Sequence, residues 1–169
     1  MEWEGKSHGN KAEEFEKLRG WPRQTGLSPR IVTDLGVGEE RSRFEAEGWD
    51  FLGPEPVCSD WREYRSFLAA SRGEFSPAKS GYVTARTGWF SDRSALYLAL
   101  GRPVLLQETG WSAWLPEGKG LVAFRTPEEA AAKAREIESD HGRHARAAEE
   151  VAREHLAAEK SIVNALKRL

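Results

Sequence analysis

Apolar and polar residues form two kinds of pattern along the chain: short apolar runs, and amphipathic stretches between them. The runs are rich in β-branched and other apolar residues and predict strands over 30–35, 49–52, 74–78, 103–107 and 121–124. Between them, apolar residues recur at spacings of three and four, which predicts helices over 11–18, 38–47, 60–71 and 91–100. The Gly- and Pro-containing segment 20–26 predicts a turn, and 84–94 a loop that leads into a helix. From Thr126, with Pro127 after it, an Ala-rich helical pattern runs to Leu169 with a break near 140–142.

Strands that alternate with helices are typical of βαβ units. The pattern therefore predicts an α/β fold, a single Rossmann-like domain over 1–169 with a mainly parallel sheet flanked by helices. Residues 1–10 are polar and Gly-containing, and they predict an arm or linker. Residues 141–169 are expected to form C-terminal helices.

Composition narrows the function classes. The 169 residues suit one domain, and the net charge of −2 argues against non-specific binding of nucleic acid. One cysteine, Cys58, excludes an intramolecular disulfide and a multi-cysteine zinc site, and the four histidines show no metal-binding spacing. We therefore expect neither a metal nor a cofactor. Because no long apolar stretch or signal-like N-terminus is present, we expect a cytoplasmic protein without a membrane span.

The segment TARTGWFSDRS at residues 84–94 carries the clearest candidate chemistry. Gly88 allows a tight turn, and Ser91 is a natural N-cap with Asp92 and Ser94 beside it. Free N–H groups at a helix start favour an anion, and the guanidinium groups of Arg86 and Arg93 suit a phosphate. A plain capped helix with solvated arginines is an equally good interpretation of these residues.

A second candidate follows the apolar run 103–107. The strand would deliver Glu108, Thr109 and Gly110 to the carboxyl edge of the sheet, where ligands bind in parallel α/β folds. Glu108 can accept hydrogen bonds from sugar hydroxyls, although an ordinary polar turn also fits the spacing. Trp111 and Trp114 follow, and they serve either as stacking surfaces for a sugar or as hydrophobic anchors of the loop.

The run GWFSDRSALYLALGRPVLLQETGWSAWLPEGKGLVAF, residues 88–124, resembles the C-terminal, donor-binding domain of GT-B-type nucleotide-sugar glycosyltransferases. The order GWFS, then GRPV, then TG, then GLV matches that family, and TPEEAAAKAREI at residues 126–137 continues it. The segment SRGEFSPAKSGYV, residues 71–83, resembles one bacterial branch of these enzymes. The resemblance extends from about Trp49 to the C-terminus.

Two departures from the family pattern concern the charged residues. Alignment on Gly101 and Pro103 places Gly88 and Leu96 where retaining members carry glutamates, so the usual ribose-binding carboxylate is absent unless Asp92 replaces it. The Arg and Lys that clamp the diphosphate do not appear in the usual G-R-x-x-x-x-K form, and three basic residues are their possible substitutes: Lys79, Arg86 and Arg93.

The resemblance implies a nucleoside-diphosphate sugar as substrate and an acceptor-binding N-terminal domain or separate subunit as partner. The chain is the length of one such domain, so we expect it to be inactive in transfer by itself. The catalytic residues are not assigned. A non-catalytic Rossmann-like interaction module that has lost the donor pocket is the alternative. The implied donor-binding residues are Lys79, Arg86, Gly88, Trp89, Phe90, Ser91, Asp92, Arg93, Ser94, Glu108, Thr109 and Gly110.

Overall fold

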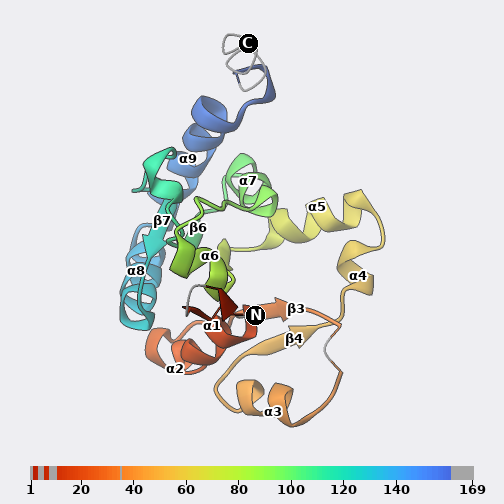
Figure 1. Cartoon of the computed structure of the whole chain (residues 1–169). Coiled ribbons are helices and arrows are strands. Elements are labelled where there is room, and N and C mark those ends of the chain that lie inside the picture. The colour runs from red at the N-terminus through yellow and green to blue at the C-terminus, as the bar shows by residue number, and fades with distance from the viewer. Residues whose placement is uncertain (1, 4–5, 8–10, 35, 161–169) are drawn as a thin grey trace.

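The computed structural model describes residues 2–3, 6–7, 11–34 and 36–160. Five of its strands form two separate parallel sheets (Figure 1). In the smaller sheet, β3 (Arg30–Val32) pairs with β4 (Asp50–Leu52). The larger sheet has the order β5 (Glu74–Ser76), β6 (Val104–Gln107), β7 (Leu121–Phe124). Near the N-terminus, β1 (Glu2–Trp3) and β2 (Lys6–Ser7) form a short antiparallel pair.

Helices connect and flank the strands of both sheets. The α-helices are α1 (Lys11–Lys17), α2 (Trp21–Thr25), α3 (Glu39–Glu45), α4 (Glu55–Cys58), α5 (Trp61–Ala70), α6 (Ser80–Ala85), α7 (Asp92–Ala99), α8 (Pro127–Ser139) and α9 (His141–Val151). A 3-10 turn, η1 (Trp111–Ala113), and a π-helical turn, η2 (Ala152–Leu156), complete the set. The predicted α/β class and parallel pairing are confirmed, while the two small sheets match a Rossmann-like arrangement only loosely. The last part of the predicted C-terminal helices, 161–169, lies outside the described residues.

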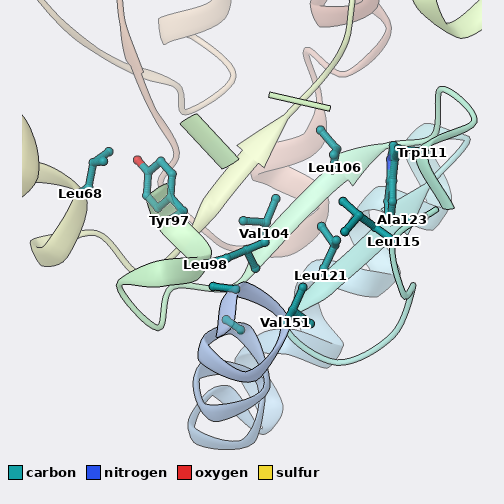
Figure 2. Close-up of a cluster of buried hydrophobic side chains, with 12 residues drawn as sticks. Leu68, Tyr97, Leu98, Val104, Leu106, Trp111, Leu115, Leu121, Ala123 and Val151 are labelled. Carbon is teal, nitrogen blue, oxygen red and sulfur yellow. The ribbon is translucent and has the colours of Figure 1, made fainter. Parts of the chain in front are cut away.

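Both faces of the larger sheet are covered, and all residues of β6 and β7 are buried. Successive side chains of a strand point to opposite faces. Val104 and Leu106 accordingly join a core with Leu98 of α7 and Val151 of α9, which Figure 2 shows, and Leu105 joins a second core against α8. This double burial explains why the runs VLLQ and LVAF read as continuous apolar segments.

Aromatic side chains connect the smaller sheet to the larger one. The ring of Trp21 on α2 stacks on Phe75 of β5 with the centroids 4.4 Å apart, and Trp49, beside β4, stacks on the same ring at 6.2 Å. The Trp49 Nε1 donates to the backbone oxygen of Arg19 at 2.7 Å. Phe75 is therefore the common contact of two tryptophans from the N-terminal third of the chain.

Three short helices differ from the sequence prediction. Residues 20–26 were expected to turn, but Pro22 fits the first turn of α2, and Gly26 ends the helix at φ +71°. The helix α4 also begins with Pro54 and Pro56 around its first turn. The helix α6 follows the predicted strand 74–78 and includes the first two residues of the predicted loop 84–94. Its six residues give too few apolar positions to reveal a period.

The loop before β7 lies against α9. A Cβ atom at Gly120, whose φ is +85°, would lie 2.3 Å from the backbone nitrogen of Ala148, so no side chain fits there. The Gly120 N–H donates to Nδ1 of His144, which is buried, at 3.3 Å. Burial lowers the pKa of His144 below its usual value. The accepting nitrogen requires the neutral ring, so the contact and the burial both favour the uncharged form.

We expect His144 to make folding sensitive to mild acid. Because its folded pKa lies below the unfolded value, its contribution is complete above about pH 6.5 and is lost as the pH falls through the folded pKa. Urea unfolding at pH 7, 6 and 5 measures this loss, whose limit is about 1.4 kcal/mol per pH unit. The variant His144→Asn keeps an acceptor but does not titrate, so its unfolding free energy should fall less steeply.

The exposed His155 supplies the matched control, because His155→Asn should retain the wild-type slope. Equal slopes in wild type and His144→Asn would contradict the assignment. The groups whose charges act on His144 are the same in all three proteins: Glu136, Asp140, His141 and Lys119.

Candidate functional site

The predicted site residues follow the carboxyl ends of β5 and β6. Lys79 precedes α6, Arg86 ends α6, Ser91 begins α7, and 108–110 follow β6. The two predicted segments are in contact. The Gly88 N–H donates to the Thr109 backbone oxygen at 2.7 Å, and the Thr109 hydroxyl donates to the Trp89 backbone oxygen at 2.6 Å. The structure thus brings the segments 84–94 and 108–110 into contact, with Thr109 fully buried between them.

Aromatic rings cover this junction. Trp89 stacks on Tyr82 of α6 with the centroids 5.2 Å apart, and Phe90 meets Trp114 edge-to-face at 5.8 Å. The Trp114 Nε1 donates to the Gly88 backbone oxygen at 3.2 Å, although the residue is 54% exposed. Trp111 is fully buried, and its Nε1 donates to the Gln107 backbone oxygen at 3.1 Å, so this tryptophan is a hydrophobic anchor.

The loop residues after β6 bind one another. Oε1 of the buried Glu108 accepts the N–H of Gly110. Its Oε2 has no hydrogen-bond partner among the described residues and lies 4.0 Å from Nη2 of Arg125. At Gly110, with φ +99°, a Cβ atom would lie 3.0 Å from the Arg86 backbone oxygen. Glu108 therefore braces its own turn and keeps one oxygen without a hydrogen bond.

The start of α7 carries several polar groups. Ser91 is the N-cap residue in extended conformation, but its side chain makes no capping hydrogen bond. Its hydroxyl donates to Oδ1 of Asp92 at 3.5 Å, a long contact, and the same Oδ1 accepts the Arg93 N–H at 2.9 Å. The hydroxyl of Ser94 is buried without a hydrogen-bond partner in the described part of the chain. The Ser91 side chain therefore does not cap α7.

Arg93 is held by β5. Its Nε lies 2.6 Å from Oε1 of Glu74, and its Nη2 donates to the Ser76 hydroxyl at 3.2 Å. Burial by itself lowers the pKa of Arg93, but the charge and hydrogen bond of Glu74 outweigh it and raise the pKa above the usual value. No local pattern in the sequence connects Glu74 with Arg93, which lie 19 residues apart.

Lys11 is a residue that the sequence analysis missed. Burial together with the charges of Arg93 and Lys79 lowers its pKa to about 8, although the charge of Glu74 acts in the opposite direction. The charges of two other cations and of one buried carboxylate therefore act on Lys11. Nothing in the local sequence indicates this, because 11–18 shows only the pattern of an ordinary amphipathic helix.

The two remaining predicted cations are exposed. Lys79 places its Nζ 5.7 Å from the ring centroid of Tyr82. Arg86 adopts a left-handed conformation, φ +48°, where it ends α6. Its backbone oxygen faces Gly110, while its side chain is exposed.

The helix α1 covers part of the carboxyl edge of the larger sheet. Nε2 of Gln107, the last residue of β6, donates to Oε2 of Glu14 at 2.6 Å. The hydroxyl of Ser80, at the start of α6, donates to Oε2 of Glu13 at 2.9 Å. Figure 1 shows α1 and α6 close together between the two sheets. The acidic side of α1 therefore contacts the end of β6 and the start of α6, and Lys11 is the first residue of the same helix.

Comparison with models of protein families, with curated proteins and with solved structures finds no match to this chain. Within the described residues, no group of three or more His, Cys, Asp or Glu side chains is placed to hold a metal ion. Among the helices that the structure describes, none is long and apolar enough to span a membrane. The geometry and charge of the strand ends are thus the basis for any functional proposal.

The N-cap residues of α7 and α8, Ser91 and Thr126, should differ in how much they contribute to stability. The Thr126 hydroxyl accepts the Glu129 N–H at 3.2 Å, so Thr126→Ala should lower the free energy of unfolding by about 1 kcal/mol. Ser91 makes no such bond, and Ser91→Ala should cost less than about half of that. Urea unfolding of both variants at neutral pH measures the difference. An equal cost would mean that the Ser91 hydroxyl caps α7 and is not free for a ligand.

Proposed function

We propose that this chain binds the diphosphate of a nucleoside-diphosphate sugar and forms the donor-binding half of a glycosyltransferase. The observation that supports the proposal is the ion pair of Arg93 with Glu74 beside the start of α7, where the charges of Arg93 and Lys79 also act on Lys11. The Arg93 side chain is 40% exposed, so its guanidinium group can meet an anion from solvent. The site follows parallel strands, whose carboxyl ends are the usual place for ligands in α/β folds.

The chemistry of the groups suits a diphosphate. A guanidinium group forms paired hydrogen bonds to phosphate oxygens, and ammonium groups add point charges. The amide groups at the start of α7 and the Ser91 hydroxyl add neutral donors. Glycosyl transfer from such a donor builds negative charge on the departing phosphate, and fixed cations stabilise that charge in the transition state.

The neighbouring loops are suited to the rest of the donor. The exposed face of Trp114 offers an aromatic surface on which a sugar or a base can stack, and Phe90 supports it from the side. Oε2 of Glu108, which makes no hydrogen bond among the described residues and lies 4.0 Å from Nη2 of Arg125, would accept a hydroxyl group of the sugar. The acceptor substrate would bind to an N-terminal domain or a separate subunit. This proposal includes two further points: that the chain has a Rossmann-like architecture, and that it is related to the GT-B-type glycosyltransferases.

Titration calorimetry with UDP, GDP, ADP and inorganic pyrophosphate tests the proposal. We expect at least one nucleoside diphosphate to bind. The double variant Ser91→Ala with Arg93→Ala should weaken its affinity at least about tenfold, because charge-assisted hydrogen bonds to the anion are lost. The control Arg153→Ala removes the same charge from an exposed position on η2 and should bind like wild type. Absence of binding by all four probes would reject the donor site.

The affinity for a nucleoside diphosphate should also fall in mild alkali. An anion favours the protonated form of Lys11, whose pKa is about 8, so binding is tightest below pH 8 and weakens above it. The phosphate groups finish their own ionisation at lower pH. Calorimetry from pH 7 to pH 9 should show a fall of up to about tenfold in wild type. Lys11→Arg keeps the charge at all these pH values and should show a smaller fall, and an equal fall would contradict the role of Lys11.

The interaction module remains the second candidate, and one observation favours it. Because α1 contacts the end of β6 through Glu14 and the start of α6 through Glu13, part of the carboxyl edge is already occupied by the chain itself. A protein with a filled edge can use this surface to support a partner instead of a ligand. Failure of UDP, GDP, ADP and pyrophosphate to bind a folded wild-type chain would favour this candidate.

A further inference from the structure

Glu74 is a buried acidic residue at the start of β5, on the same face of the strand as Ser76. Together the two side chains contact Arg93 at two of its nitrogen atoms, Nε and Nη2. The Glu74 side chain is only 5% exposed, whereas that of Arg93 is 40% exposed. One side of the guanidinium group is therefore fixed to the strand, and another part of it reaches solvent.

The hydrogen-bonding capacity of Arg93 is not used up by these contacts. A guanidinium group has five N–H donors in a rigid plane. The described contacts use one on Nε and one on Nη2, so about three remain for a further acceptor. Because the group is planar, fixing two of its atoms also fixes the direction of the other donors. An arginine held in this way loses little conformational freedom when an anion binds.

The second carboxylate oxygen of Glu74, Oε2, is buried and has no hydrogen-bond partner among the described residues. A buried oxygen without a donor is unfavourable for folding. If the only role of Glu74 were to satisfy Arg93, a paired contact of both carboxylate oxygens with the guanidinium group would be the stronger arrangement. The single contact of Glu74 at Nε, with that of Ser76 at Nη2, leaves the other N–H groups of the outer nitrogens available, while Oε2 of Glu74 stays without a hydrogen bond among the described residues.

We propose that Glu74 is a positioning residue, which together with Ser76 aims the free N–H groups of Arg93 at the bound anion. This inference rests on the proposed function, because the anion is the diphosphate of the donor. Its rival is competition, in which the Glu74 carboxylate and the ligand contend for the same arginine. The two differ in sign, since removal of a positioning residue weakens binding and removal of a competitor strengthens it.

Two substitutions separate the geometry of Glu74 from its charge. Glu74→Asp keeps the charge but withdraws the carboxylate by about 1.5 Å, so Arg93 loses its support. Glu74→Gln keeps an oxygen at the same reach and removes the charge. Calorimetry with the tightest-binding nucleoside diphosphate, and with pyrophosphate as a second probe, should show about a tenfold loss of affinity for Glu74→Asp. Glu74→Gln should stay within about threefold of wild type. Circular dichroism and thermal unfolding establish that both variants are folded.

A double-mutant cycle with Arg93→Met distinguishes positioning from a structural role. If Glu74 acts through Arg93, Glu74→Asp should change the affinity less than about twofold in the Arg93→Met background. A loss that persists there would overturn the proposal, and so would affinity in Glu74→Asp equal to or above that of wild type. If pyrophosphate binds and nucleoside diphosphates do not, the donor assignment is rejected. The double-mutant cycle of Glu74 and Arg93 is then measured with pyrophosphate and still tests the positioning role. If neither probe binds wild type, both proposals are rejected.

Discussion

A negative charge enclosed at the start of β5 requires a positive partner, and this requirement organises the candidate site. Burying an unpaired carboxylate is costly, so Glu74 depends on Arg93, which in turn ties the first turn of α7 to the strand. Lys11 brings the N-terminal helix into the same electrostatic environment. The balance of charge around Glu74 therefore affects the packing of α1, β5 and α7, and it also affects how much positive charge is available to a ligand.

Most of the fold was visible in the sequence because its signals are local. The doubly buried runs of β6 and β7 are continuous apolar segments, and Thr126 with Pro127 marks the start of α8 as predicted. The short helices α2, α4 and α6 were missed because four to six residues do not complete enough turns to show a period. The division of the strands between two sheets depends on pairing between distant segments, which single-chain periodicity does not record.

The candidate site was predictable to a lesser degree, for the same reason. The start of α7 and the turn after β6 were identified by their own residues, and their mutual contact follows from parallel strands ending at one edge. The contacts of Arg93 with Glu74 and of Glu14 with Gln107 join elements that are separate in the chain, and the charges that act on Lys11 come from distant residues. Side chains that meet only through tertiary packing leave no local pattern, so Lys11 looked like any helix-surface lysine.

The strand β5 separates two incompatible environments across its thickness. Phe75 lies among the rings of Trp21, Trp49 and Phe124, whereas Glu74 and Ser76 on the opposite face hold a guanidinium group. A slip of one residue in the pairing with β6 would move a carboxylate into the aromatic cluster and a phenyl ring against the arginine. Misaligned chains are thus penalised twice during folding, once by charge burial and once by lost ring stacking. The side chains of this three-residue strand therefore fix its register, which so short a strand would not do by its backbone hydrogen bonds alone.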